Sequence, residues 1–177
     1  SEFAKIVLGK DNPKIAILNI GTEQDKGKSY ISETAKALEK SFLSKNYIGY
    51  IEGNDMTKGI ADVVISDGFS GNIALKTAEG TAKFITDNLK MSLTENFFSK
   101  FSLIFSYFSL KKFKEKLDPR KYNGAIFLGL NGPVVKSHGG TDALGFYYSI
   151  DLCYKIIKGN LMTQIKNNLN HLNEENI

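Results

Sequence analysis

Short apolar runs alternate with segments of helical spacing in the first half of the chain. Residues 15–20, Tyr47–Ile51 and Val63–Ile65 are nearly unbroken apolar runs, as expected of strands that are covered on both faces of a sheet. Apolar residues recur at helical spacing in residues 28–42 and 71–90. This alternation predicts an α/β fold with a mostly parallel sheet.

The C-terminal third of the chain continues the mixed pattern. Residues 124–130 and Val134–Lys136 are predicted as two short strands around a glycine-proline turn. A helix is expected to follow with Thr141 as its N-cap, and a last helix is expected at residues 161–172. Four apolar or aromatic residues at helical spacing predict the buried face of the first of these helices: Tyr147, Ile150, Tyr154 and Ile157.

Residues 96–117 form a hydrophobic and basic segment with helical character. The apolar members include Phe101, Ile104, Phe105 and Phe108, and the basic members include Lys111 and Lys112. One interpretation is a buried helix of an α/β layer. Because the aromatic residues recur too densely for a single buried stripe, the other interpretation is a helix at a membrane interface or beside a tunnel for an apolar ligand.

The composition narrows the classes of protein without selecting one. A length of 177 residues with 42% hydrophobic residues fits one globular domain or part of one. The net charge of +4 suits an acidic partner, a phosphate or an anionic membrane surface, and it falls short of the dense basic patch of a dedicated nucleic-acid binder. With one cysteine, Cys153, and two histidines, His138 and His171, we expect no internal disulfide, no metal site and no cofactor.

The ends of the chain and its apolar windows suggest where the protein works. Neither a secretory signal nor an apolar window of membrane-spanning length is recognisable, so the default location is the cytoplasm. Residues 1–3 resemble an expression remnant. Residues 4–8 have helical character, so the chain is expected to begin in the middle of a fold. We therefore expect a fold that is incomplete at the N-terminus.

Two loops lie directly after predicted strands. Residues 67–72 lead from a strand into a helix through two glycines, and this geometry directs free backbone N–H groups and the positive end of a helix dipole toward an anion. Residues 21–27 follow the first strand, and ligands of parallel sheets bind beyond the carboxyl ends of strands. The candidate binding residues in and beside these loops are Gly21, Thr22, Lys26, Asp67, Ser70, Gly71, Asn72 and Lys76.

Three familiar chemical interpretations are disfavoured. Gly27-Lys28-Ser29 resembles the end of a P-loop, but five residues separate Gly21 from Gly27, one more than that loop requires. Ser70 resembles the nucleophile of a serine elbow, but the next glycine comes one position early, so a helix N-cap is the simpler role. Cys153 lies on the apolar face of a predicted helix, which favours a core residue over a nucleophile.

Four blocks of sequence, taken in order, resemble the PlsX family of bacterial phosphate acyltransferases. They are Leu-Asn-Ile-Gly-Thr-Glu at 18–23 with Lys26 and Gly27, Glu-Gly-Asn-Asp at 52–55, Ser-Asp-Gly-Phe-Ser-Gly-Asn at 66–72, and Leu-Gly-Leu-Asn-Gly at 128–132 with Val-Lys-Ser-His-Gly at 135–139. Lys28 stands where the family often has asparagine, and Gly140-Thr141 stands where a serine pair is common. Since the family usually has a further N-terminal portion of similar size, residues 1–177 are expected to be the C-terminal portion of such a protein.

The resemblance carries expectations about fold and activity. It implies a three-layer α/β/α sandwich like that of isocitrate and isopropylmalate dehydrogenases, assembled as a homodimer. It implies transfer of a fatty acyl group from acyl carrier protein to inorganic phosphate, giving acyl phosphate for phosphatidic acid synthesis. It also implies a peripheral association with the membrane. The basic residues expected to face the acidic carrier protein are Lys111, Lys112, Lys114, Arg120 and Lys121.

The residues of the two loops suit this chemistry. Phosphate is already a nucleophile, so the reaction needs no covalent enzyme intermediate, but two anionic centres must be held together: the phosphate and the oxyanion of the thioester carbonyl. We hypothesise that residues 70–72 supply hydrogen-bond donors, with Asn72 catalytic, and that Lys26 and Lys76 supply charge. His138 is expected to donate to the oxyanion or to protonate the leaving thiolate.

Two other functions remain open from the sequence. A phosphate acetyltransferase or butyryltransferase would use coenzyme A in place of the carrier protein, whereas the long apolar segment at 96–117 favours a long acyl chain. A non-catalytic fragment that dimerises and binds membranes is the alternative from a different class.

Overall fold

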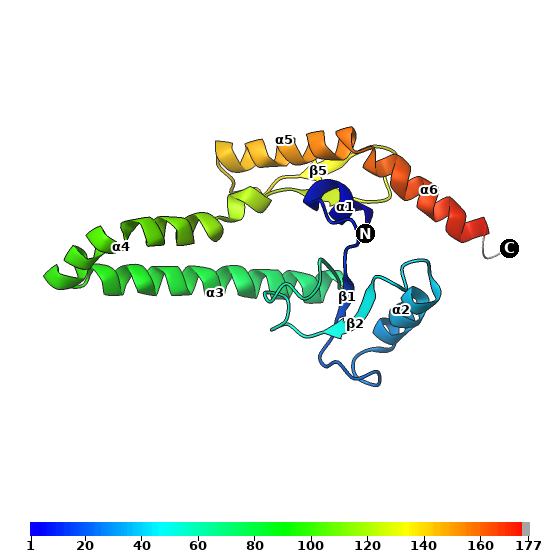
Figure 1. Ribbon diagram of the computed structural model, residues 1–177, viewed down its shortest axis with the longest axis horizontal. Coiled ribbons are helices and arrows are strands. Elements are labelled where there is room, and N and C mark those ends of the chain that lie inside the picture. The colour runs from blue at the N-terminus through cyan, green and yellow to red at the C-terminus, as the bar shows by residue number, and fades with distance from the viewer. Residues whose placement is uncertain (175–177) are drawn as a thin grey trace. The chain divides into compact units, whose positions relative to one another are not determined.

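The computed structural model describes the backbone of residues 1–174 and the side chains of residues 1–170 (Figure 1). The chain divides into two compact units. The first, which we call the sheet unit, consists of Ser1–Ser66 together with Asn123–Ile177. The second, which we call the hairpin unit, is Asp67–Tyr122.

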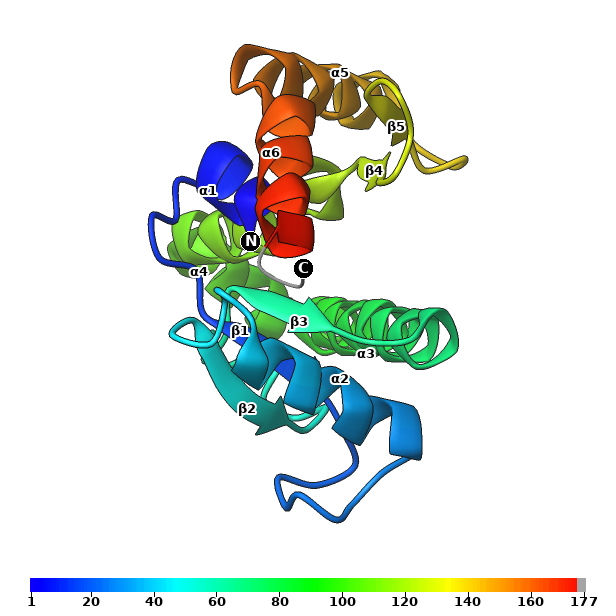
Figure 2. The same cartoon turned by 90° about the vertical axis from the view of Figure 1, so that its right-hand side faces the viewer.

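The sheet unit contains three parallel strands in the order β2-β1-β3 (Figure 2). They are β1 (Ile15–Leu18), β2 (Tyr47–Ile51) and β3 (Val63–Ile65), and helix α2 (Ser29–Lys40) connects β1 to β2. The bounds predicted for the second and third strands and the parallel arrangement are confirmed. The first strand ends at Leu18 rather than at residue 20, because the chain leaves the sheet with Ile20 79% exposed.

The central strand explains why these apolar runs form a parallel sheet. Ile15, Ala16 and Ile17 are each at most 2% exposed, since neighbouring strands and covering residues bury both of their faces. Gly49 interrupts the β1–β2 ladder, where Ile15 pairs with Tyr47 but Ile17 pairs with Tyr50. Gly49 has φ +95, a left-handed conformation that glycine adopts without a steric penalty.

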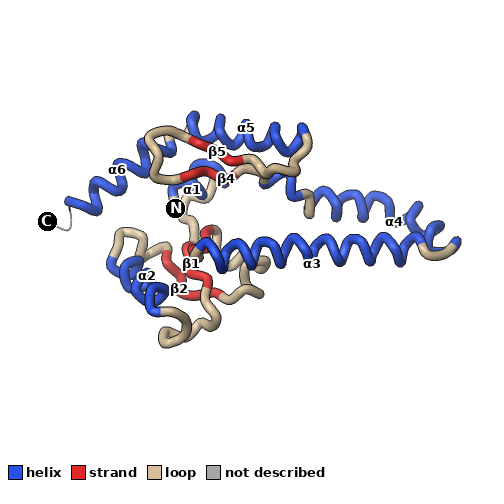
Figure 3. The backbone as a smooth tube through the Cα atoms, turned by 180° about the vertical axis from the view of Figure 1, so that it is seen from behind, coloured by secondary structure: helices blue, strands red, loops and turns tan. Residues whose placement is uncertain are grey.

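The rest of the sheet unit packs three helices and an antiparallel strand pair around a second core (Figure 3). The elements are α1 (Glu2–Leu8), β4 (Ala125–Phe127), β5 (Val134–Lys136), α5 (Ala143–Lys158) and α6 (Leu161–Glu174). Leu152, Ile156 and Leu161 form the core, and Phe3 of α1 packs against it. Residues 1–3, which resemble an expression remnant in sequence, thus contribute to this core.

Helix α5 corrects two predictions. The face expected to be buried is exposed by 56–60%, at Tyr147, Ile150, Tyr154 and Ile157. The buried face instead carries Gly145, Ser149, Leu152 and Ile156. Its small residues allow close approach, since a Cβ on Gly145 would run into the Thr141 side chain and the Ser149 Cα lies close to Gly124. The N-cap is Asp142, whose carboxylate accepts a hydrogen bond from the Gly145 N–H at 2.9 Å, rather than Thr141. Cys153, expected in the core, is half-buried.

The hairpin unit consists of α3 (Gly68–Thr94), α4 (Phe97–Lys116) and the short 3-10 helix η1 (Pro119–Tyr122). Helices α3 and α4 lie side by side (Figures 1 and 3). The predicted helical character of residues 96–117 is confirmed. Neither helix has a buried residue, so within this unit α4 is not the buried layer helix of the first interpretation.

The architecture agrees with the coarse prediction of an α/β protein. A parallel three-stranded sheet combined with many helices is compatible with an α/β/α sandwich. The likeness to isocitrate and isopropylmalate dehydrogenases stays a prediction. Among the described residues, no helix combines the length and the apolar character needed to cross a membrane.

Candidate functional site

The loop at residues 21–27 leaves the carboxyl end of β1 and carries Gly21, Thr22 and Lys26. The Lys26 Nζ lies 2.7 Å from Glu23 Oε1, and both side chains are about half exposed. The hydrogen bond from Lys26 lowers the pKa of Glu23, and the hydrogen bond and charge of Glu23 raise the pKa of Lys26. Lys26 is therefore a cation at neutral pH, already turned toward a carboxylate that an incoming anion would have to displace.

Asn19, directly after β1, anchors this loop to the end of the strand. Its side chain is 6% exposed, and Nδ2 donates a hydrogen bond to the Lys26 carbonyl at 2.9 Å. A Cβ on Gly27, which has φ +92, would run into the Asn19 side chain, so the close approach requires glycine. The Asn19 Oδ1 is buried without a hydrogen-bond partner among the described residues. Sequence reasoning missed Asn19, although a polar residue that ends an apolar strand was the available signal.

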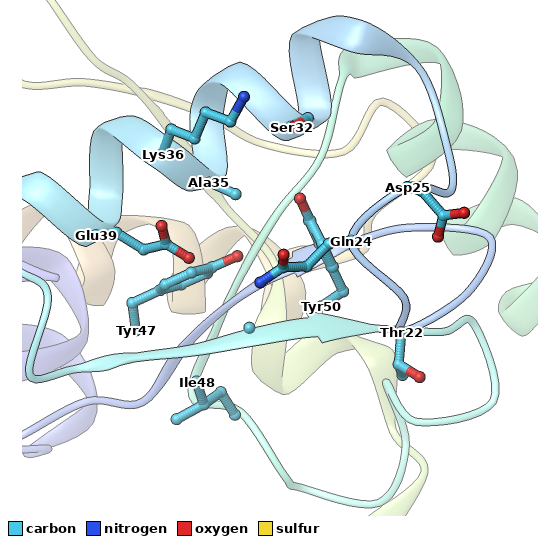
Figure 4. A pocket seen from close by; sticks show the side chains of 11 residues that line it. Thr22, Gln24, Asp25, Ser32, Ala35, Lys36, Glu39, Tyr47, Ile48 and Tyr50 are labelled. Carbon is cyan, nitrogen blue, oxygen red and sulfur yellow. The ribbon is translucent and has the colours of Figure 1, made fainter.

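A cavity of about 480 Å³ lies beside the same loop, between α2 and β2 (Figure 4). Tyr47 and Tyr50 of β2 and Ala35 of α2 are among the residues that line it. Burial raises the pKa of Tyr47 to about 12, helped by the charges of Tyr50 and Glu39, so its hydroxyl stays neutral. The loop contributes Thr22, Gln24 and Asp25 to the lining. The volume is in the range of small-ligand sites, with polar groups on all sides.

The start of α3 corrects the predicted anion site. Asp67 is the N-cap, and its Oδ1 accepts hydrogen bonds from the N–H groups of Phe69 at 3.0 Å and Ser70 at 2.8 Å. The Gly71 N–H donates to the Asp67 carbonyl at 2.9 Å. Ser70 is therefore not the N-cap, and the backbone donors of Ser70 and Gly71 are engaged, because the Asp67 carboxylate already occupies the helix end.

The side chains of this region remain as candidates in the hairpin unit. Asn72 is exposed in the first turns of α3, and Ser70 is half-buried. Lys76 Nζ lies 2.6 Å from Glu79 Oε2, and both side chains are substantially exposed. The candidates 67–76 thus share one end of α3, while Lys26 and His138 belong to the sheet unit.

His138 lies in the loop between β5 and α5. Its Nδ1 accepts a hydrogen bond from the Gly140 N–H at 3.2 Å. A nitrogen that accepts from a backbone N–H carries no proton of its own, so the neutral imidazole has its proton on Nε2. The main chain closes the same turn, because the Thr141 N–H donates to the His138 carbonyl. His138 is therefore arranged as a hydrogen-bond donor through Nε2.

The candidates of α4 form an exposed surface of apolar and basic side chains. Phe101, Ile104, Phe105 and Phe108 are 54–77% exposed. Toward the end of α4 an open cavity of about 520 Å³ combines apolar and charged lining residues: Leu103, Tyr107, Leu110, Lys111, Lys114, Glu115, Asp118 and Arg120. Lys112 and Lys121 are exposed nearby in sequence. Hydrogen bonds from Arg120 lower the pKa of Asp118 to about 2, so this pair stays ionised at neutral pH.

No group of three or more potential metal ligands occurs in the part of the chain that the structure describes. His171, one of the two histidines, lies outside the residues whose side chains are described. The candidate side chains supply lysine ammonium groups, an imidazole, and hydroxyl and amide groups. These groups stabilise anions and oxyanions.

Comparison with known proteins places the chain in a family. The family described as "Fatty acid synthesis protein" matches residues 1–164. The chain is 51% identical over 170 residues to the phosphate acyltransferase of Pelagibacter ubique, which covers 96% of this chain and 51% of that protein. It is 45% identical over 171 residues to the phosphate acyltransferase of Nitrobacter hamburgensis, covering 96% of this chain and 48% of that protein. The chain thus spans about half the length of the curated relatives it matches.

Proposed function

This chain belongs to the fatty acid synthesis protein family, and on that basis we propose that the protein transfers a fatty acyl group from acyl carrier protein to inorganic phosphate. The observation that carries the proposal is the similarity of nearly the whole chain to proteins named phosphate acyltransferase. The product is acyl phosphate, which serves phosphatidic acid synthesis. The chain corresponds, in this proposal, to the C-terminal portion of such an enzyme.

The reaction joins one phosphate oxygen to the thioester carbonyl carbon and breaks the carbon–sulfur bond. After the phosphate oxygen has added and before the carbon–sulfur bond breaks, the carbonyl oxygen is an oxyanion. The proton of the hydrogen phosphate is transferred to the departing sulfur, which leaves as a thiol. The Lys26 ammonium compensates the charge of the phosphate. His138 donates a hydrogen bond from Nε2 to the oxyanion or to the departing sulfur and keeps its own proton, a role that the Gly140 N–H on Nδ1 supports.

The start of α3 contributes through side chains in this proposal. Since Asp67 caps the helix, its carboxylate orients the first turn and leaves phosphate binding to the Ser70 hydroxyl, the Asn72 amide and the Lys76 ammonium. Gly71 keeps the first turn free of a side chain that would obstruct substrate. An anion that approaches Lys26 or Lys76 competes with a nearby glutamate, so binding of phosphate exchanges one carboxylate contact for another anion.

The identity of the acyl donor is the sharpest test of the proposal. A carrier protein is favoured over coenzyme A by the exposed apolar face and lysine-rich end of α4, because a basic surface attracts an acidic partner. We expect acyl phosphate to form from a long-chain acyl carrier protein with at least about tenfold higher kcat/KM than from acetyl or butyryl coenzyme A. Equal or better use of the short coenzyme A esters would favour a phosphate acetyltransferase or butyryltransferase, and no product from either donor would refute acyl transfer.

A second function is supported by the hairpin unit alone. Helices α3 and α4 have no buried residue, so their apolar side chains need a covering surface. We propose that a second copy of the chain and an anionic membrane surface supply it, which makes the protein a homodimer that binds membranes peripherally. Liposome binding without acyl phosphate formation would favour this non-catalytic function.

A further inference from the structure

Asn123 connects several parts of the loop that carries His138. Its Nδ2 lies 3.0 Å from Ser137 Oγ, 3.1 Å from Thr141 Oγ1 and 2.9 Å from the Gly145 carbonyl oxygen. Its Oδ1 accepts a hydrogen bond from the His138 N–H at 3.0 Å. The two amide hydrogens are shared among three acceptors, so one side chain ties both ends of the loop to the first turn of α5.

The surroundings of Asn123 leave little freedom for this arrangement to change. The next residue, Gly124, has φ +117, and a Cβ there would lie 2.9 Å from Leu152 Cδ2. A Cβ on Gly145 would run into Thr141 Oγ1 and lie 3.4 Å from Asn123 Nδ2. Two glycines thus allow the backbone beside Asn123 and the first turn of α5 to approach closely.

The His138 turn depends on these anchors for its shape. Within the turn, the Gly140 N–H meets His138 Nδ1 at 3.2 Å and the Thr141 N–H meets the His138 carbonyl at 3.2 Å. Both bonds are near the long end of the usual range for N–H donors. Asn123 holds the backbone of His138 on one side and Thr141 on the other, at shorter distances, so it maintains the turn in which the ring is oriented.

We propose that Asn123 is a positioning residue that keeps the His138 proton on Nε2. By holding the turn closed, Asn123 keeps the Gly140 N–H on Nδ1 and so selects the tautomer that donates from Nε2. That this tautomer contributes to catalysis rests on the proposed acyl transfer. The positioning of the His138 ring by Asn123 does not depend on that function. The proposal assigns a function to a residue that none of the sequence blocks contains.

Histidine labelling with 15N tests the role directly, because the chain has only two histidines. We expect one ring of the protein to show the Nε2–H tautomer almost alone. In Asn123→Ala, the ring resonances of His138 should move toward those of an unconstrained histidine, and exchange of the His138 backbone amide should accelerate about tenfold or more. Unchanged resonances and unchanged exchange in a folded variant would overturn the proposal.

Matched variants separate positioning from a general loss of structure. Asn46→Ala removes a similar bond, from Asn46 Nδ2 to the Pro13 carbonyl at 3.2 Å, elsewhere in the sheet unit, and should leave His138 unchanged. If Asn123→Ala does not fold, Thr141→Val provides the second measurement, since it removes one acceptor of the Asn123 amide and should produce a smaller shift of the same resonances. A shift in Asn46→Ala as large as that in Asn123→Ala would contradict a specific role.

Kinetics then connect the tautomer to catalysis. Because an oxyanion donor acts in the transition state, Asn123→Ala should lower kcat for acyl phosphate formation about tenfold or more while KM for phosphate stays within about twofold. Loss of turnover with unchanged His138 resonances would overturn the positioning role. If the unaltered protein forms no acyl phosphate, the proposed function fails, while the labelling experiment still decides the role of Asn123.

Discussion

The two units of this protein differ in how far they bury their apolar side chains. The sheet unit buries Ile15, Ile156 and Leu161 to 2% exposure or less. The hairpin unit leaves Phe98 83% exposed and has no buried residue in α3 or α4. Burial of apolar area is the main favourable contribution to folding, so the first unit contains its own source of stability. The second unit consists of helices whose apolar surface is available to a partner or a membrane.

Truncations of apolar side chains in the two units should differ most in their effect on stability. Leu161→Ala removes a fully buried side chain and leaves a cavity, so it should lower the free energy of unfolding by about 2–5 kcal/mol. Phe105→Ala, at a side chain 77% exposed, should change it by less than about 0.5 kcal/mol. Urea denaturation of both variants measures the difference. A comparable cost for Phe105→Ala would mean that the hairpin unit has a core of its own.

Membrane binding should depend on the hairpin unit alone. Changing Phe101, Ile104, Phe105 and Phe108 to serine removes exposed apolar area and should weaken binding to anionic liposomes about a hundredfold or more without unfolding the protein. Flotation of the protein with liposomes measures the loss. The exposed stripe of α5 offers a control of equal size, because serine at Tyr147, Ile150, Tyr154 and Ile157 should leave binding unchanged. Retained binding in the α4 variant would contradict the membrane proposal.

Turnover should depend on Lys26 and Asn72, with a smaller effect than the loss of membrane binding. In the full-length enzyme, Lys26→Ala and Asn72→Ala should each lower the rate of acyl phosphate formation by more than about tenfold, because each removes a group that stabilises charge in the transition state. Lys58→Ala is a matched control for Lys26, since Lys58 pairs with Asp55 in the same unit at 2.8 Å and has no proposed role. Rates close to those of the unaltered protein for both variants would refute the assignment.

Local patterns predicted most of the secondary structure, because strands and helices depend on neighbours in the sequence. Tyr47–Ile51 and Val63–Ile65 have the predicted bounds, since short apolar runs favour strands. The cover on both faces that was predicted for all three strands holds for the central strand but not for β2 and β3, because these lie at the edges of the sheet, with Ile48 42% exposed and Val63–Ile65 half-buried. Helix α3 begins at Gly68 rather than at residue 71, because the Asp67 carboxylate caps it. An aspartate directly before Gly68, the first residue of the helix, was a readable signal for that cap.

The buried face of α5 was predicted wrongly for a different reason. This helix has apolar residues on more than one face, so spacing alone does not select the face that is buried. The buried face carries the small residues Gly145 and Ser149, which allow Thr141 and Gly124 to approach the helix closely. A hydrophobicity pattern gives glycine and serine less weight than Tyr147 and Ile150. Small side chains nevertheless allow the closest packing, because the distance between packed elements depends on side-chain size.

The sequence by itself determined the kinds of elements, their order, and the loops that carry Lys26 and His138, since these follow from local spacing and from the order of four blocks. Asn72, expected in a loop, lies in α3. Only the tertiary structure decided what surrounds those residues. Asn19 and Asn123 lie 7 and 15 residues from the groups that they hold, Lys26 and His138, and these contacts leave no periodic signal in the sequence. A hydrogen bond depends on atoms brought together by folding, and that juxtaposition is a property of the folded chain.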